Sequence, residues 1–414
     1  MKRFICIFVC FPILLTGCWN RREPKNLSLI SSVLYDRSDD GTYKTILEII
    51  NPEAEGGPVG GGGEKSPIIT VEGEGISIPE AIRMTSQSLE RSLFAGQTLV
   101  RFFTEKLAKH DIMSVQDYFF RDPLTDEKPY VVVVKGDNPE KVFECKLGLS
   151  ENLGNYIDGL KVSQHNFITR SVFVDTLTFI KDYFNEGKQP VAGVVEITEE
   201  VQSEKNDNKS AGGSDDGNEK SGNTKGSEKR YKLIYTGLAA FKDKKLVGYM
   251  DDMEASCYNI LTNNFGNGVI NLSEDGGGNL NTVRIASAKT DINPSLKDDK
   301  LSFDINIRCS NTLTQVSDKY DISKSEPLKE LETLFNKTLK EHIGSTIEKA
   351  QKAFKSDIFG FGIAVHSKYP KEWKDMKTNW DNAFSLAEVN VSVQSKITRS
   401  GQLKKPLLLK EDAS

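Results

Sequence analysis

The segment that most constrains this chain is its first eighteen residues. Lys2 and Arg3 give it a positive start, and residues 4–15 carry no charge. Such an apolar run enters a membrane because burying its side chains is favourable, but it is shorter than the about 20 residues that span one. The run ends at Leu14–Cys18, LLTGC, where two small residues precede a cysteine. This pattern predicts a lipoprotein signal peptide over 1–17 and lipid on the Cys18 thiol. An ordinary signal peptide with a chance cysteine is the alternative.

A lipid on Cys18 would place the rest of the chain outside the cytoplasm, anchored to the outer face of the cell membrane. No later segment has the apolar length of a transmembrane helix, so we expect an anchored protein that does not span the bilayer. The chain has 54 basic and 59 acidic residues, a formal net charge of −5. Nucleic-acid binding needs a basic face, so this balance predicts no nucleic-acid partner.

The chain has six cysteines, and two of them, Cys6 and Cys10, leave with the signal peptide. Besides Cys18, the remaining cysteines are widely separated, at Cys145, Cys257 and Cys309. Three such residues do not make a disulfide framework, so the fold must rest on its apolar core. Cys309 shares its strand face with core residues, which predicts a buried thiol.

Residues 18–200 alternate between strand and helix patterns, which predicts a mixed α/β domain. Alternating apolar residues on both sides of a Gly turn predict a hairpin over 27–50. Residues 130–134 are apolar throughout, as in a strand covered on both faces. The other predicted elements are a strand at 68–71, a helix at 79–93, a strand at 98–103, a helix at 113–120, and a helix at 175–184 whose apolar face is Leu177, Ile180 and Phe184.

The composition changes at about residue 200. Residues 201–230 are almost entirely polar and small, which predicts a disordered linker between domains. A middle region follows at 231–285, beginning with a predicted strand over 231–241, and a helix is predicted over 251–261. The last domain is expected at 286–410.

In that last domain, Leu328 to Phe354 carries apolar residues at every third or fourth position, which predicts a long helix over 326–355. Ser325 is its expected N-cap. We expect the apolar stripe to lie across a sheet, and an interaction face is the alternative. Alternating apolar residues predict strands at 301–309 and 389–397. Trp373 and Trp380 are expected to pack in the core. The fold class is therefore α+β or mixed α/β, with small mixed sheets and packed helices in a multi-domain ectodomain.

Motifs that carry chemistry are missing from the sequence. The Gly-rich run 56–63 does not form a phosphate loop, because Glu64 precedes Lys65 and a predicted strand follows. The usual zinc spacings and nucleophile elbows are absent. The four histidines lie far apart, at His110, His165, His342 and His366. We therefore predict no catalytic residues, no metal site, no cofactor and no enzyme.

Several segments together resemble one family. Gly17–Glu23 reads GCWNRRE, Gly75–Ala81 reads GISIPEA, and Gly237–Lys242 reads GLAAFK. Asp357–Gly362 reads DIFGFG and is followed by Pro370, Trp373 and Trp380. These segments resemble the Ger(x)C family, the lipoprotein C subunits of nutrient germinant receptors in bacterial spores. The resemblance covers almost the whole mature chain, although Asn20 stands where the family has Asp.

The resemblance implies a role in spore germination beside the integral-membrane A and B subunits of a germinant receptor, at the inner membrane of the spore. It also implies lipid on Cys18, no enzymatic activity, and several small mixed α/β domains. Whether this subunit contacts a nutrient stays open. Two other readings remain: a solute-binding lipoprotein of an ABC-type importer, and an envelope hydrolase, which would need a pocket with convergent carboxylates or a nucleophile.

Overall fold

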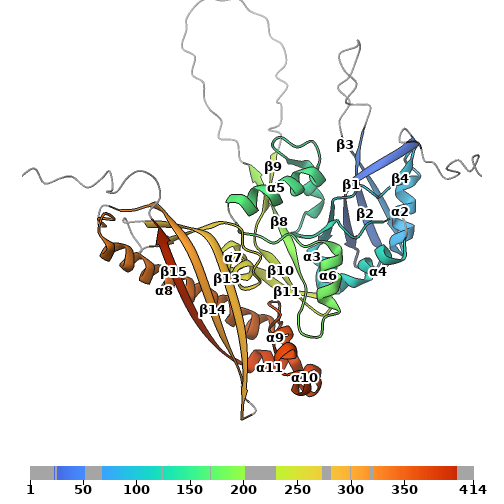
Figure 1. Cartoon of the computed structure of the whole chain (residues 1–414). Helices are drawn as coiled ribbons and strands as arrows, with labels where there is room; N and C mark the ends of the chain where they lie inside the picture. Colours follow the sequence, from blue (N-terminus) through green and yellow to red (C-terminus); the bar gives the residue numbers. More distant parts are fainter. Residues whose placement is uncertain are drawn as a thin grey trace, which may run out of the picture.

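The computed structural model describes residues 23, 26–51, 68–122, 125–167, 169–200, 230–272, 281–298, 300–317 and 320–398 (Figure 1). The predicted hairpin is confirmed. Strands β1 (Leu27–Arg37) and β2 (Tyr43–Ile50) pair antiparallel, and β3 (Ile68–Gly75) adds to β2. Gly41 in the turn has φ 91°, a value that glycine adopts without steric cost.

These strands belong to an eleven-stranded mixed sheet whose main path runs β11-β10-β8-β6-β5-β1-β2-β3. Strands β1, β5, β6 and β8 are mutually parallel at its centre. The short strand β4 pairs with β1, and β7 pairs with β9 beside β8. The bounds are β4 (Ser92–Phe94), β5 (Val100–Thr104), β6 (Tyr130–Lys135), β7 (Cys145–Lys146), β8 (Val191–Glu200), β9 (Arg230–Tyr235), β10 (Leu238–Lys242) and β11 (Lys245–Met250).

Helices cover both faces of this sheet. In β6, Val131 and Val133 join one apolar core, and Val132 and Val134 join the other. This confirms the strand covered on both faces. The first core packs under α2 (Ile78–Ser86), α3 (Glu105–Asp111), α4 (Met113–Arg121) and α6 (Thr176–Tyr183). The second packs under α5 (Leu153–Phe167) and the 3-10 helix Pro139–Glu144.

Two helix predictions in this half are corrected. The helix expected over 79–93 ends at Ser86, where the hydroxyls of Thr85 and Ser86 bond carbonyls three residues back and compete with further turns. In α6 the buried residues are Thr176 and Phe179. Phe184, expected on the buried face, is 74% exposed because the helix has ended and the chain turns away there.

The segment 201–229 lies outside the described residues, but the strands on either side of it are informative. β8 and β9 pair antiparallel from Val195↔Tyr235 to Glu200↔Arg230. The segment therefore connects two neighbouring strands of one sheet. The strand expected over 231–241 is divided into β9 and β10 at Gly237, whose φ is 74°.

A second sheet has four strands in the order β12-β13-β14-β15. They are β12 (Gly268–Leu272), β13 (Asn281–Lys297), β14 (Lys300–Gln315) and β15 (Glu388–Thr398). Strand β13 runs through residues 285 and 286, where the limit between the middle region and the last domain was expected. In β14, Phe303, Ile305, Ile307 and Cys309 are buried on one face, as the alternation predicted.

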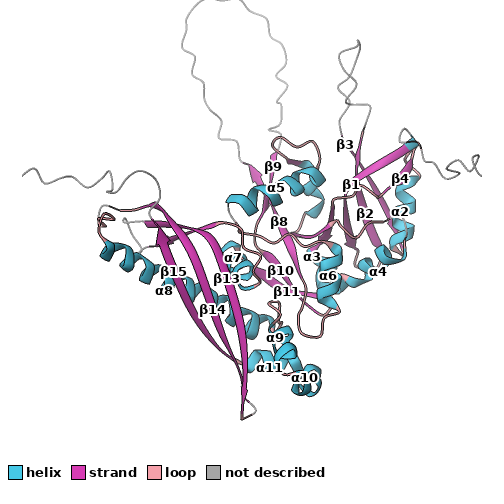
Figure 2. Ribbon diagram, in the orientation of Figure 1, coloured by secondary structure: helices cyan, strands magenta, loops and turns pink. Residues whose placement is uncertain are grey.

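Helix α8 (Ser325–Lys349) lies along that face, and a π-helical turn (Ala350–Phe354) continues it (Figure 2). The buried stripe Leu331, Phe335, Leu339, Ile343 and Ile347 confirms the predicted core helix. Its start differs from the prediction: Lys324 is the N-cap, and Ser325 is already helical, with its hydroxyl bonded to Glu326.

Helix α7 (Asp252–Leu261) joins the two halves. Its buried residues share one apolar core with residues of both sheets and of α8. A capping box between Asp251 and Glu254 fixes its start, which confirms a helix here. The chain then completes its C-terminal half with α9 (Phe361–Lys368), α10 (Pro370–Met376) and α11 (Trp380–Leu386). The fold is thus multi-domain α+β, as predicted, although its first sheet is larger than expected.

Candidate functional site

The DIFGFG segment folds around the carboxylate of Asp357, which is fully buried. Oδ1 accepts the backbone N–H groups of Phe359, Gly360 and Phe361 at 3.2, 2.9 and 3.1 Å. Oδ2 accepts the N–H of Gly362 at 2.8 Å and the indole Nε1–H of Trp380 at 3.1 Å. Burial raises the pKa of Asp357 to about 6, and these donors act in the opposite direction. One side chain therefore satisfies the first two N–H groups of α9 and those of the two residues before it.

The two glycines of this segment have separate roles. Gly360 has φ 84°, a left-handed conformation that L side chains rarely adopt. Gly362 meets Gly187, and a Cβ on Gly362 would lie 2.6 Å from the Gly187 Cα and 2.8 Å from Trp373 Cη2. The sequence therefore needs glycine at Gly362 and Gly187 for the two backbone segments to touch.

The same segment ties the C-terminal helices to the large sheet. The Asp357 carbonyl accepts the backbone N–H of Gln189 at 2.7 Å, just before β8. The Ser356 hydroxyl donates to the carbonyl of Phe241 in β10 at 2.6 Å. Trp373 and Trp380, buried as predicted, pack against each other with ring centroids 5.1 Å apart. We call this arrangement the Asp357 joint.

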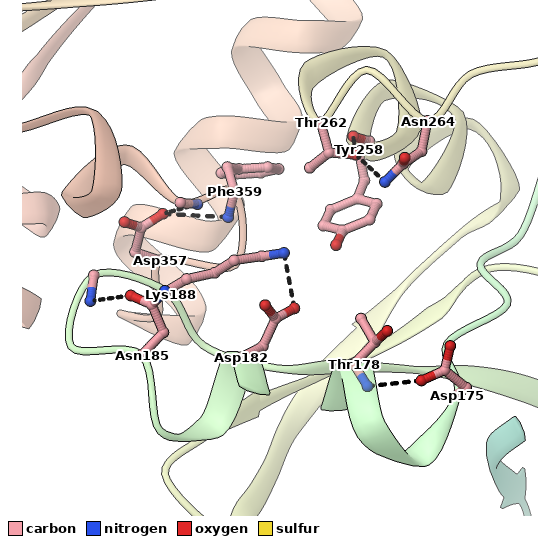
Figure 3. A network of polar contacts seen from close by, with 12 residues as sticks. Asp175, Thr178, Asp182, Asn185, Lys188, Tyr258, Thr262, Asn264, Asp357 and Phe359 are labelled. Carbon is pink, nitrogen blue, oxygen red and sulfur yellow. Dashed lines mark hydrogen bonds and ion pairs between the residues drawn. The ribbon is translucent and has the colours of Figure 1, made fainter. Parts of the chain in front are cut away.

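Beside the joint lies a largely buried ion pair. Asp182 at the end of α6 accepts from Lys188 Nζ at 2.8 Å, and their side chains are 15% and 17% exposed. Figure 3 shows the Tyr258 hydroxyl of α7 directed toward the same ammonium. Burial raises the pKa of Asp182, and Lys188 partly offsets this. Burial acts to lower the pKa of Lys188, but Tyr258 and Asp182 raise it overall.

This ion pair faces a cleft of about 470 Å³ between α5, the segment 169–174, α6 and the C-terminal end of α7. Its volume is within the range typical of small-molecule sites. The apolar part of its lining is Val172, Phe173, Val174 and Phe265. Asp182 is the only carboxylate that the lining contributes from the described residues, so the convergent carboxylates that a hydrolase would need are not found in this cleft.

The predicted site residue, Cys18, lies outside the described residues. The other mature-chain cysteines are free and buried, and burial raises the pKa of each of these thiols to about 12. This confirms the buried Cys309. His110 bonds Arg37, whereas His366 stacks on Trp373, so the structure does not bring them together. Across the described ranges, no group of three or more His, Cys, Asp or Glu residues could hold a metal ion.

Sequence reasoning missed Asp182, Lys188 and Tyr258. Asp182 and Tyr258 lie in predicted helices, and periodicity assigned a position only to the apolar residues of those helices. The sequence did contain a usable signal, because Asp182 and Lys188 are opposite charges on either side of Gly187. The side chain of Asn185 accepts the backbone N–H of Gly187 and forms a turn that can bring the two charges together.

Comparisons with known proteins agree over most of the chain. Residues 20–197 match the family described as spore germination protein N-terminal domain. Residues 236–401 match the family described as spore germination B3/GerAC like, C-terminal. The crystal structure of the GerBC protein is similar with a TM-score of 0.49 at 19% identity, covering 88% of this chain and 96% of that one.

Relatives match along their whole length. Spore germination protein KC of Bacillus subtilis (strain 168) is 26% identical, with 95% of each chain covered. Spore germination protein B3 of the same strain is 22% identical over 94% of this chain and 96% of its own. GerQC of Bacillus cereus is 20% identical over 97% and 99%. These relatives give no support to the importer alternative. The chain belongs to the Ger(x)C family of spore germination proteins, and its role is in spore germination.

Proposed function

We propose that the chain is the lipid-anchored C subunit of a nutrient germinant receptor. Diacylglycerol on Cys18 would hold it at the outer face of the inner membrane of the spore. The observation that carries the proposal is the combination of a lipoprotein signal, LLTGC, with family matches over 20–197 and 236–401. Two acyl chains bind a bilayer firmly where one is marginal. In the described part of the chain, no helix has the length and apolarity to cross a membrane.

The anchor is tested with Cys18→Ala in spores, with Arg22→Lys as a matched control outside the lipid site. Cys18→Ala should abolish lipid labelling and shift the protein from the membrane to the soluble fraction, whereas Arg22→Lys should do neither. Membrane retention of an unlabelled Cys18→Ala protein would contradict the anchor.

The subunit would act by contact with the integral-membrane A and B subunits and would turn over no substrate. The family membership supports this part of the proposal, since relatives named spore germination protein match this chain along nearly their whole length. Crosslinking with mass spectrometry in intact spores tests it. Crosslinks from this chain to both membrane subunits are expected. If the chain were recovered in spores with crosslinks only to unrelated proteins, the receptor assignment would be wrong, whatever the state of Cys18.

A further inference from the structure

The last strand of the second sheet, β15, presents a long backbone edge. It pairs with β14 from Ser302↔Glu388 to Thr312↔Thr398 without a register shift, and it stands at the end of the strand order. Figure 1 shows β15, in red, at the border of this sheet. The strand contains no proline, and its two charged residues are Glu388 and Lys396. Natural edge strands are commonly short, bulged, charged or covered, because unpaired N–H and C=O groups attract another strand.

One hydrogen bond shows which backbone groups of β15 face away from β14. The N–H of Ile397 donates to Glu332 Oε1 of α8 at 2.7 Å, so it points outward. The N–H and C=O of one residue point to the same side of a strand, and those of the next residue point to the other side. The outward groups of this regular strand therefore belong to its odd-numbered residues. In the described part of the chain, no backbone hydrogen bond joins those of Val389, Val391 and Val393 to another segment.

The sequence of β15 is complementary to itself in one antiparallel register. With Ser392 opposite the same residue of a second copy, Val391 lies opposite Val393, and both present outward backbone groups that can bond each other. On the exposed face, Glu388 then lies opposite Lys396 at both ends of the pairing. Opposite charges directly across a strand pair are stabilising. The valines of β15 pack against the core but are only half-buried, so a neighbouring strand would cover them further.

We propose that β15 pairs antiparallel with β15 of a second copy of this chain, about a two-fold axis at Ser392. The two four-stranded sheets then become one continuous sheet. A two-fold contact uses the same patch of both subunits, which a self-complementary strand supplies. The pairing satisfies the outward N–H and C=O groups and places each Glu388 against a Lys396. The proposal goes beyond the proposed receptor role and does not depend on the anchor or on the membrane subunits.

Disulfide crosslinking tests the register in the full chain purified in detergent. Ser392→Cys should form a disulfide-linked dimer on mild oxidation, because facing Cα atoms in such a pair are about 4.5 Å apart, within disulfide range. Asn306→Cys is the matched control, since Asn306 lies beside Ser392 on β14 and is also exposed. Its copies would be about 14 Å apart, two strand spacings further, and should not crosslink. The unaltered chain gives the background, because Cys145, Cys257 and Cys309 are buried.

Charge reversal tests the same register without a new bond. Lys396→Glu places like charges opposite each other at both ends and should raise the dimer dissociation constant by about tenfold, measured by sedimentation equilibrium. Adding Glu388→Lys to that variant should restore dimerisation, because the two charges are exchanged. Lys289→Glu, an exposed change on β13 and away from the edge, should leave the dimer unaffected.

Three results would overturn the proposal. The first is a chain that stays monomeric at about 100 µM, where mass action favours association. The second is equal crosslinking of Ser392→Cys and Asn306→Cys, and the third is a charge reversal that the exchanged pair does not rescue. If Ser392→Cys crosslinked in spores only to a different protein, the edge of β15 would belong to that partner and not to a second copy.

Discussion

Two neighbouring carboxylates, Asp357 and Asp182, show how differently one fold can hold a buried negative charge. Asp357 is closed on all sides and accepts hydrogen bonds from four backbone N–H groups and one indole, all neutral. Asp182 has one cationic partner and keeps contact with a cleft. The Asp357 carboxylate organises a chain segment and has little capacity left to accept further hydrogen bonds. The Asp182 carboxylate can still accept several.

The comparison distinguishes a buried charge that holds the fold together from a charge that solvent or a ligand can reach. A buried polar group with every partner in place makes one conformation unique, and its removal leaves those partners unsatisfied. An ion pair at a cleft can exchange part of its bonding with water or a ligand, so its removal costs less. The following changes test this comparison, beginning with the largest expected effect.

Asp357→Ala should be the most destabilising change. It leaves four backbone N–H groups and the Trp380 indole without their acceptor in the interior. We expect a loss of about 3–5 kcal/mol in the free energy of unfolding, measured by urea denaturation, because several buried donors are orphaned together. The control is Asp375→Ala on exposed α10, which should change stability by less than about 0.5 kcal/mol. Similar effects of the two changes would contradict the Asp357 joint.

Gly362→Ala should come next. The added Cβ would lie 2.6 Å from Gly187 Cα and 2.9 Å from the Gly187 carbonyl oxygen, so backbone has to move. We expect a loss of about 1–3 kcal/mol, as for other overpacked sites. Gly344→Ala in α8 is the matched control, since its Cβ meets nothing within 4 Å. That change should stabilise the chain by about 0.5–1 kcal/mol through helix propensity. Equal effects at the two glycines would show that the close approach is not rigid.

How much of this could be predicted from the sequence depended on periodicity. Alternation in β14 and the three-and-four spacing of α8 each reflect one buried face, so their prediction was correct at Phe303 and Leu339. The helix over 79–93 was extended too far because its hydrophobic spacing continues past Thr85, while local hydroxyl bonds end the helix. Helix α6 ends at Tyr183, so the apolar pattern that predicted a buried Phe184 extended one residue past the end of the helix.

The site was harder to predict because its parts are brought together by topology. Asp357 and its glycines were visible as a motif, although the acceptor role of the carboxylate was not. Asp182 and Tyr258 come from helices 76 positions apart in numbering, and no periodic pattern joins them. The two sheets have a shared core through α7, which local patterns on either side of 201–229 could not indicate.

Measuring the free energy of unfolding over a range of pH tests the Asp357 carboxylate with a smaller structural change than its removal. Burial raises the pKa of Asp357 to about 6, so the folded chain holds this proton more tightly than the unfolded chain. The stability contributed by Asp357 is then complete below about pH 4 and is lost as the pH rises through about 6. The free energy of unfolding of the wild type minus that of Asp357→Asn should therefore fall between these values. A difference that rises instead would mean that the five donors outweigh burial.

The smallest expected effect is the coupling between Asp182 and Lys188. A double-mutant cycle with Asp182→Asn and Lys188→Met isolates the energy of the pair from other effects of each change. The pair is largely buried but open to the cleft, so we expect a coupling of about 1–2 kcal/mol, above the about 0.2–1 kcal/mol of exposed pairs. The same cycle with Glu196→Gln and Lys135→Met, whose side chains are 41% and 42% exposed, supplies that reference. Urea denaturation measures both cycles. If the two couplings were equal, Asp182 and Lys188 would be solvated like a surface pair. The contrast with Asp357 would then be one of exposure alone.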